Sequence, residues 1–363
     1  MYKYLIFFIF LLPFAIESFF NGIPNRFSRS LLNMNFKYAK EYYDFFIEYK
    51  EKNKFLLKGE NKNIDYRQFA KKNNNSYHIF ERNYKEIKKQ NEILKKKNLS
   101  LELGINQFMD SDDFLLNNEI NPPDQSPINY KKIIKDPINY ITNLWDSNSS
   151  FSWNNTGLLS DVKNQLSCGS CWAFSTTTSL ETFMRINNFT VDRLSEQELV
   201  DCSTENSGCN GGLMHLAMDF IIKNKGLSSN TDYPYDPDNS DHCKLNITKV
   251  KGSNISEYLL TIPESINDLK YSVKKNPVAI ALDADNIFFR FYKKGVIDIP
   301  IENSKQLNHA VLLVGYDYDE HGMYWIIQNS WGESWGDNGF CKIRVKPKEG
   351  TLLCQLYGVY PSN

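Results

Sequence analysis

One segment of the sequence combines two cysteines with the start of a helical pattern. It reads Cys168-Gly-Ser-Cys171-Trp-Ala-Phe, and apolar residues then recur at three- and four-residue spacing as far as Asn187. A cysteine in the first turn of a helix has its thiolate favoured by the helix dipole and by unpaired backbone N–H groups. A thiolate is a strong nucleophile, so Cys171 is the candidate for covalent catalysis.

Closely spaced cysteines also serve two other kinds of chemistry. A zinc site on Cys168 and Cys171 needs a second pair at matching spacing, but Cys202 and Cys209 are farther apart and lie among turn residues. A thioredoxin-like redox pair needs a strand in a βαβ unit before the motif, and none is predicted. We therefore expect neither a metal nor another cofactor.

A nucleophilic cysteine needs a base, and the base needs an orienting partner. Among the five histidines, His309 stands out because it opens the apolar stretch Val311–Val314, which predicts a strand as rigid support. Asn329 follows another apolar stretch, and its amide oxygen can fix an imidazole without adding charge. Such residues are usually structural, but beside a nucleophile we interpret them as base and orienting partner. Trp331 and Trp335 supply large apolar rings nearby.

The elements that must position these residues change type along the chain. Further helices are predicted over Ser195–Val200 and Leu213–Lys223. The predicted strands all follow Pro277, and they are Val278–Leu282, Ala310–Val314, Tyr324–Gln328 and Phe340–Val345. Helices followed by strands are typical of an α+β domain.

The first part of the chain has a different texture. Residues 33–97 are polar, with apolar residues at helical spacing: Phe36, Tyr43, Phe46, Ile47, Phe80, Tyr84, Ile87 and Leu94. Gly104 is the first helix breaker, and prolines between residues 122 and 137 mark an extended connector. Since all seven cysteines lie beyond this connector, it reads as the boundary between two units.

Met1–Ser18 has the pattern of a secretory signal peptide. Lys3 precedes the apolar run Leu5–Phe14, and small residues follow. An uncleaved anchor is the alternative because Phe19 and Phe20 extend the run, but Pro13 interrupts it. Seven Asn-x-Ser/Thr sequons would then be open to glycosylation, and they begin at Asn74, Asn98, Asn148, Asn154, Asn188, Asn246 and Asn254.

Composition excludes several classes of protein. The 363 residues carry 42 basic and 43 acidic side chains, so nothing global attracts nucleic acid. A hydrophobic share of 41% excludes a wholly disordered chain, and no run of 18 apolar residues follows the N-terminus. The charge is uneven, with 23 basic and 18 acidic residues up to Asp146 but 19 and 25 after it. The two halves should attract each other, and protonation of carboxylates should weaken that attraction.

At these residues the chain resembles the papain family of cysteine protease precursors, nearest to the cathepsin L type. The signature of that family is C-G-[SA]-C-[WY], with a histidine and an asparagine far downstream. Here His309 follows Cys171 by 138 residues and Asn329 follows it by 158. The resemblance extends over nearly the whole chain from Phe36.

The resemblance implies a role for each matching residue. Cys171 would be the nucleophile, His309 its ion-pair partner, Asn329 the orienting group, and Gln165 an oxyanion-hole donor. The implied substrate-binding residues are Gly211, Gly212, Leu213, Met214, Asn308, Ala310, Trp331 and Tyr357. Leu213, Met214 and Ala310 would wall an apolar pocket for the second residue before the cut, with Tyr357 or Val359 as its floor. No metal or other cofactor is implied.

The resemblance also implies a domain order and a fold class. Residues 1–18 would be the signal peptide, 19–146 an inhibitory propeptide and 147–363 the mature protease. The mature part would be a papain-like α+β fold, in which a helical subdomain and a β-barrel-like subdomain flank the active-site cleft. The helical propeptide would lie through that cleft backwards until acid loosens it.

Two propeptide motifs of the family can be compared with this chain. Phe80, Asn83, Ile87 and Asn91 match the last four positions of the E-R-F-N-I-N helix motif, whereas Lys72 and Ser76 replace the first two. The motif G-x-N-x-F-x-D is intact as Gly104, Asn106, Phe108 and Asp110.

The implied partners are protein and peptide substrates, the chain's own propeptide as an intramolecular inhibitor, and cystatin-type inhibitors. We expect no nucleic acid partner, no stable membrane association after signal cleavage, and a monomer. The implied location is the secretory pathway, ending in a lysosome- or vacuole-like acidic compartment or outside the cell.

Family spacing implies the disulfides Cys168–Cys209 and Cys202–Cys243, which leave Cys341 and Cys354. The usual third bridge of the family cannot form, because residues 300–307 contain no cysteine. A strand–turn–return path could join Cys341 to Cys354, and two buried thiols are the alternative.

Leu166 is a further departure, because the family commonly has glycine after the oxyanion-hole glutamine. A positive φ there would strain leucine by roughly 1–2 kcal/mol. We expect the turn to adjust so that Gln165 still reaches the oxyanion.

Three rival functions remain. A catalytically inactive papain-like homologue acting as a binding protein would usually lack Cys171 or His309. A transglutaminase or acyltransferase would use a Cys-His-Asp set, which Asn329 argues against. An exopeptidase would need an extra loop that blocks one end of the cleft, and no long histidine-bearing insertion is present in the first subdomain.

Overall fold

The computed structural model describes residues 38–52, 74–111, 120, 149–238, 242–244, 246–298, 306–346 and 357–363. The chain divides into two compact units. The first comprises Met1–Lys85 and Met109–Ser111, and the second comprises Glu86–Phe108 and Asp112–Asn363. The predicted domain boundaries after residues 18 and 146 both fall outside the described residues, so they stay predictions.

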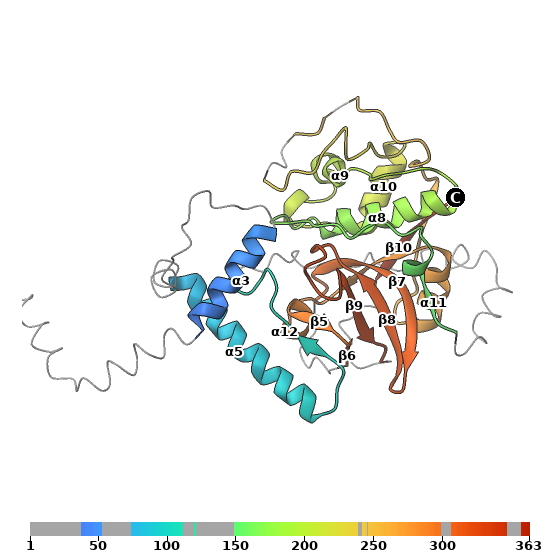
Figure 1. Cartoon of the computed structure of the whole chain (residues 1–363). Coiled ribbons are helices and arrows are strands. Elements are labelled where there is room, and N and C mark those ends of the chain that lie inside the picture. The colour runs from blue at the N-terminus through green and yellow to red at the C-terminus, as the bar shows by residue number, and fades with distance from the viewer. Residues whose placement is uncertain are drawn as a thin grey trace, which may run out of the picture. The chain divides into compact units, whose positions relative to one another are not determined.

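The first unit packs helix α3 (Ala39–Lys52) against the beginning of α5 (Asn74–Lys96) (Figure 1). Its core is aromatic: the ring of Phe80 lies 5.0 Å from that of Tyr42 and 5.4 Å from that of Phe45. Tyr42 and Phe45 are buried, whereas the predicted Tyr43 is half-buried, and the side chains of the predicted Phe46 and Ile47 lie outside those described. Asn83 donates from Nδ2 to the carbonyl of Met109 at 3.0 Å.

The second unit begins in the middle of α5. Asn91, one of the motif asparagines, bonds Leu103 through both its amide oxygen and its amide nitrogen, each at 2.8 Å. This holds the short strand β1 (Glu102–Leu103) against the helix, and β1 pairs with β5 (Tyr292–Lys294). The family motif therefore fixes where the chain reverses after α5.

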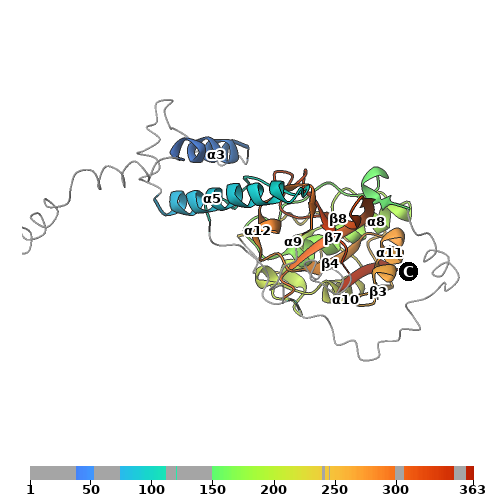
Figure 2. The same ribbon diagram turned by 90° about the horizontal axis from the view of Figure 1, so that it is seen from below.

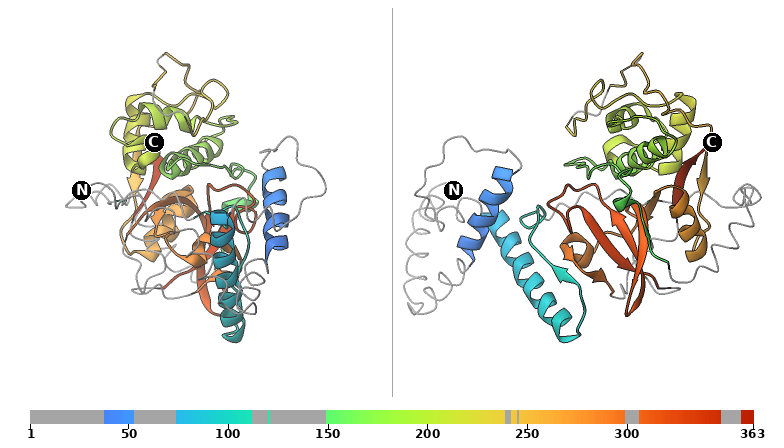
Figure 3. Two further views of the ribbon diagram at one scale, coloured as in Figure 1. Left: turned by 90° about the vertical axis from the view of Figure 1, so that its left-hand side faces the viewer. Right: turned by 45° about the vertical axis from the view of Figure 1, so that its right-hand side comes forward.

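Helices gather on one side of the second unit and strands on the other (Figure 1, Figure 3). The helices of the first side are α8 (Cys171–Ile186), α9 (Glu196–Cys202) and α10 (Met214–Lys223), with the 3-10 turn η2 (Gly208–Asn210) between the last two. All three helices were predicted, with boundaries within two residues. Ser195 caps α9 by accepting from the N–H of Glu198 at 2.9 Å.

Eight described strands form one sheet in the order β3, β10, β4, β7, β8, β9, β6, with β2 pairing β7. Their bounds are β2 Phe151–Ser152, β3 Glu257–Leu260, β4 Val278–Leu282, β6 Val296–Ile297, β7 His309–Asp319, β8 Gly322–Gln328, β9 Phe340–Arg344 and β10 Gly358–Ser362. Within the described residues the sheet is open, with β3 and β6 at its edges. The predicted α+β class is confirmed, and the β-rich part has this open form.

Three smaller elements complete the second unit: η1 (Trp153–Asn155), α11 (Ile266–Lys275) and α12 (Ile287–Arg290). Helix α11 lies beside the sheet in both views (Figure 1, Figure 2). We did not predict α11, although Ser265 gives it an N-cap that accepts from the N–H of Asp268. None of the helices within the described ranges is both long and apolar enough to cross a membrane.

Two disulfides tie the helical side together, and both were predicted. They join Cys168 to Cys209 and Cys202 to Cys243. Cys341 is buried in β9, but Cys354 lies outside the described residues, so the Cys341–Cys354 bridge stays a prediction.

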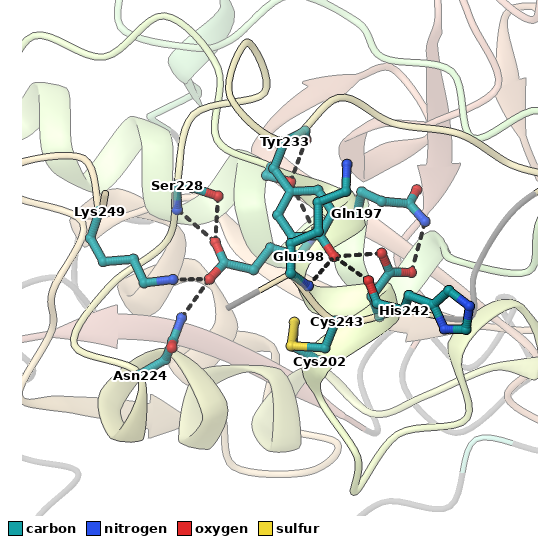
Figure 4. The surroundings of a disulfide bond; sticks show 12 residues. Gln197, Glu198, Cys202, Asn224, Ser228, Tyr233, His242, Cys243 and Lys249 are labelled. Atoms are coloured by element: carbon teal, nitrogen blue, oxygen red, sulfur yellow. Dashed lines mark hydrogen bonds and ion pairs between the residues drawn. A yellow bond between two sulfur atoms is a disulfide. The ribbon is translucent and has the colours of Figure 1, made fainter. Parts of the chain in front are cut away.

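A buried carboxylate beside the second disulfide connects three segments of the helical side (Figure 4). Glu198 accepts hydrogen bonds from Ser228, Asn224 and Lys249. Burial alone would raise the pKa of Glu198, but the bonds from Lys249 and Ser228 outweigh it and hold that pKa below its ordinary value. The ionised form therefore stabilises this part of the fold.

Candidate active site

Cys171 is the first residue of α8 and is almost completely buried. The backbone N–H of Ala310 donates to its Sγ at 3.3 Å, so a strand on the other side of the unit reaches the sulfur. This donor and the positive end of the α8 dipole both favour the thiolate. Ser170, at the N-cap position, makes no side-chain capping bond with the helix, since its hydroxyl pairs with Tyr235 at 2.8 Å.

His309 and Asn329 are brought together by the β7–β8 hairpin. His309 is the first residue of β7, and Asn329 directly follows β8. Because the two strands are antiparallel, the beginning of β7 lies next to the end of β8. His309 Nε2 lies 2.8 Å from Asn329 Oδ1.

Hydrogen bonding fixes the tautomer of the neutral imidazole. Asn329 Oδ1 also accepts from the backbone N–H of Ser330 at 2.8 Å, and a backbone N–H can only donate. The atom facing His309 is therefore the amide oxygen, so Nε2 must carry the hydrogen. Nδ1 then holds the lone pair, and it is buried without a hydrogen-bond partner in the described residues. Nδ1 is the nitrogen available for exchanging a proton.

Aromatic rings enclose His309. Trp331 stacks on the imidazole with ring centroids 4.6 Å apart, and Phe289 contacts it edge to face at 6.1 Å. Burial lowers the pKa of His309 to about 4, although the bond to Asn329 acts in the opposite direction. In this closed arrangement the imidazole is neutral near pH 7.

Gln165 is buried, and both ends of its side-chain amide are held. Its Nε2 donates to the carbonyl of Cys168 at 2.9 Å, and its Oε1 accepts from the hydroxyl of Ser330 at 2.7 Å. The carbonyl of Gln165 accepts from Tyr235 at 2.7 Å. Tyr235 thus holds both Gln165 and Ser170, a role that no sequence signal indicated.

The loop before Cys171 is also anchored through a buried charge. Lys163 Nζ lies 2.8 Å from Glu181 on α8 and 2.5 Å from Glu196 on α9. All three side chains are buried. Removing Lys163 would leave two buried carboxylates without their shared cation, and breaking a buried ion pair in this way typically costs about 3–5 kcal/mol. As with Tyr235, no sequence signal indicated this role of Lys163.

Leu166 has a φ of +52°, so the expected adjustment of the turn does not occur. Leucine itself adopts the left-handed conformation, and Gln165 remains held. The N–H of Leu166 donates to Asn164 Oδ1 at 3.0 Å, which supports the turn.

The predicted substrate-binding residues come from the segment that ends η2 and begins α10, from the beginning of β7, and from Trp331 and Tyr357. A Cβ on Gly212 would lie 2.7 Å from the Trp172 ring, so only glycine fits there. Leu213 precedes α10 and Met214 opens it, while Ala310 follows His309 in β7. Met214 and Ala310 are fully buried.

Tyr357 directly precedes β10 and contacts α10. Its hydroxyl accepts from the N–H of His215 at 3.0 Å and lies 2.6 Å from His215 Nδ1. Burial raises the pKa of Tyr357 well above its ordinary value, so the hydroxyl stays protonated and can donate to Nδ1. No sequence signal indicated this pairing with His215.

Asn308 and Gly211 both make hydrogen bonds within the protein. Asn308 Oδ1 accepts from the N–H of Ala284 at 2.8 Å, and its Nδ2 donates to Asp283 at 3.1 Å. Gly211 has a φ of +119° and accepts from the N–H of Ser207. The amide of Asn308 is thus already engaged within the protein.

Residues 102–108 lie along the Trp331 side of the site. The N–H of Gly104 donates to the carbonyl of Phe291. Asn106 Nδ2 donates to the carbonyl of Arg290, and Gln107 Nε2 donates to the carbonyl of Trp331, each at 2.7 Å. The ring of Phe108 contacts that of Trp331 edge to face at 5.0 Å. The first three motif positions of G-x-N-x-F-x-D therefore belong to the second unit, where they contact residues 290–291 and Trp331.

Comparisons with known proteins agree with this arrangement. Residues 147–357, more than half of the chain, match the family model described as "Papain family cysteine protease". A protein of Arabidopsis thaliana described as a probable cysteine protease is 36% identical over 282 residues, which cover 77% of this chain and 58% of that protein. A Caenorhabditis elegans protein described as cathepsin L-like is 45% identical over 195 residues, covering 53% of this chain and 57% of that protein. The chain thus spans somewhat more than half the length of either relative.

A solved structure extends the likeness to the precursor form. It is the digestive procathepsin L2 proteinase of Tenebrio molitor, with a TM-score of 0.69 and 29% identity. The match covers 90% of this chain and all of that one. With the family model, the relatives and the fold in agreement, the chain belongs to the papain family of cysteine proteases.

Proposed function

We propose that the chain is the zymogen of a cathepsin L-like cysteine endopeptidase. The observation that supports this best is the fixed imidazole: Asn329 holds His309 Nε2 and leaves Nδ1 to exchange a proton, while Cys171 Sγ lies at a helix N-terminus. This is the combination that a thiolate–imidazolium pair requires.

In the proposed reaction the Cys171 thiolate attacks the carbonyl carbon of a peptide bond. The oxyanion accepts from Gln165 Nε2 and from the backbone N–H of Cys171. His309 Nδ1 gives its proton to the leaving amine, and the C–N bond breaks to leave a thioester. Water then loses a proton to Nδ1 and attacks the thioester, which releases the acid and restores the thiolate.

Residues 19–146 act as the inhibitor in this proposal, and the mature enzyme begins near Ser147. The contacts of Asn106 with Arg290 and of Gln107 and Phe108 with Trp331 support this role, as does the likeness to a procathepsin structure. The signal-like N-terminus directs the chain into the secretory pathway, towards an acidic compartment or secretion. Acidification weakens the attraction between the basic first part and the acidic second part.

An irreversible epoxysuccinyl inhibitor of thiol proteases tests this function. After acid incubation of the full chain, we expect one inhibitor adduct on Cys171 by peptide mass mapping, together with loss of peptide cleavage. Absence of the adduct from a folded, processed chain would contradict the proposal and favour an inactive homologue that acts as a binding protein.

The proposed pocket for the second residue before the cut is apolar, with Leu213, Met214 and Ala310 as walls and Tyr357 as floor. We expect peptides with Leu, Phe or Val at this position to have kcat/KM at least about tenfold above the Arg peptide, because none of the four residues assigned to the pocket is acidic. A matched series of peptides differing only at this position measures the ratio. Preference for Arg over Leu would contradict the assignment of the pocket.

A further inference from the structure

Leu166 combines two features that a leucine rarely has together. It has a left-handed backbone, with φ of +52°, and 52% of its surface is exposed. Glycine would adopt this φ without strain, and burial gives no reason for an apolar side chain here. Within the described residues, two other large apolar side chains are similarly exposed, Ile105 at 45% and Phe189 at 37%. Strained residues of this kind cluster at functional sites.

The loop that carries Leu166 is fixed by backbone hydrogen bonding before Leu166 and by a disulfide after it. Before it, the N–H of Gln165 donates to the carbonyl of Ser330 at 2.9 Å, and Asn164 pairs with Trp331. After it, Cys168 is bonded to Cys209. The side chain of Leu166 is therefore presented from a fixed backbone, at the point where the loop leaves the Ser330–Trp331 segment.

This position lies on the leaving-group side of the proposed reaction. The acyl part of the substrate would lie along Gly211 and Gly212, next to the Cys209 end of the loop. His309 must reach the leaving amine, and the ring stacked on His309 is Trp331. Since Asn164 pairs with Trp331, the Leu166 end of the loop borders the Trp331 side.

The zymogen contacts leave Leu166 exposed. Trp331 is covered by Gln107 and Phe108 and retains only 4% exposure, whereas Leu166 stays half exposed with residues 102–108 in place. Packing of that part of the propeptide therefore does not account for Leu166, whose side chain is open to a substrate segment.

We propose that Leu166 is a specificity residue that contacts an apolar side chain one or two residues after the cut. This inference rests on the proposed endopeptidase function. Leu166 and Trp331 would form an apolar surface on the leaving-group side, and a substrate with a large apolar residue there would bind it in the transition state. Substrates without residues after the cut would not sense Leu166.

The test compares Leu166→Asn with the wild type. Both are produced as the full chain and are assayed after acid processing. Asparagine tolerates a left-handed backbone but is polar, so the turn is kept while the apolar contact is lost. Quenched peptides with Leu or Ser at the first or second position after the cut are the probes, each position being varied alone. We expect the Leu-over-Ser ratio of kcat/KM at one of these positions to fall by about threefold to tenfold in Leu166→Asn. Leu166→Met should retain the ratio.

Two controls separate the possible outcomes. A peptide methylamide with the same acyl part releases only methylamine, which is too small to reach an apolar surface after the cut, so its kcat/KM should be equal in wild type and Leu166→Asn. Phe189→Asn removes another exposed apolar side chain, after α8, and should leave every ratio unchanged. An unchanged Leu-over-Ser ratio at both positions in Leu166→Asn would overturn the inference. No hydrolysis of the amide by wild type would instead contradict the proposed function.

Discussion

Cys171→Ala is expected to abolish peptide hydrolysis, with kcat at least about 10⁴-fold below the wild type. The reason is that the attacking atom is lost, and Ser170 cannot replace it because its hydroxyl is paired with Tyr235. The measurement is hydrolysis of an aminocoumarin peptide amide after acid incubation of the full chain. The variant should keep its fold, since alanine is compatible with the first turn of α8.

Ser167→Ala is the matched control for Cys171→Ala. Ser167 is exposed in the same loop, and its hydroxyl makes one long contact of 3.5 Å with Asp238. This control should retain activity, and both variants should unfold at the same denaturant midpoint as the wild type. Appreciable turnover by folded Cys171→Ala would rule out the assignment of the nucleophile.

His309→Ala should lower kcat by roughly 10³-fold or more, because the general acid and the ion-pair partner of the thiolate are removed together. A readout beyond activity is the pH dependence of Cys171 alkylation by iodoacetamide. In the processed wild type we expect rapid alkylation at acidic pH. In His309→Ala the alkylation rate should increase only as the pH approaches the ordinary thiol pKa of about 8.5. Identical alkylation profiles for the two proteins would argue against an ion pair.

The precursor gives a second measurement on His309. Burial lowers the pKa of His309 to about 4 in the closed arrangement, whereas an unfolded histidine titrates near 6.5. The stability associated with the neutral imidazole is therefore fully present above pH 6.5 and is lost as the pH falls towards 4. In a Cys171→Ala background, the unfolding midpoint should fall over this range, and the fall should be smaller in His309→Ala.

Asn329→Ala is an informative companion to His309→Ala. It leaves the imidazole in place but removes the oxygen that fixes Nε2–H, so either tautomer becomes accessible. Comparing the two variants separates loss of the base from loss of its orientation.

Much of the fold was predictable because local signals and burial agree. Strand β4 matches its predicted bounds, since every residue of Val278–Leu282 is apolar and buried. Helices α8, α9 and α10 follow from their spacing and from the Ser195 cap. The misses have physical causes. Helix α11 has apolar residues at helical spacing, but its ten residues are fewer than a periodicity pattern needs, and β3 and β10 are short strands that need each other as partners.

By itself the sequence determined which residue types could do chemistry and which elements would carry them. Cys171 at a helix start, His309 at a strand start and Asn329 at a strand end are local features, readable from periodicity and turn residues. Tertiary structure alone decided their chemistry. The tautomer of His309 depends on the N–H of Ser330, the donor to the Cys171 sulfur comes from Ala310, and the left-handed Leu166 is held by Asn164. These are hydrogen bonds and burial between segments that the chain brings together only on folding, so no local pattern encodes them.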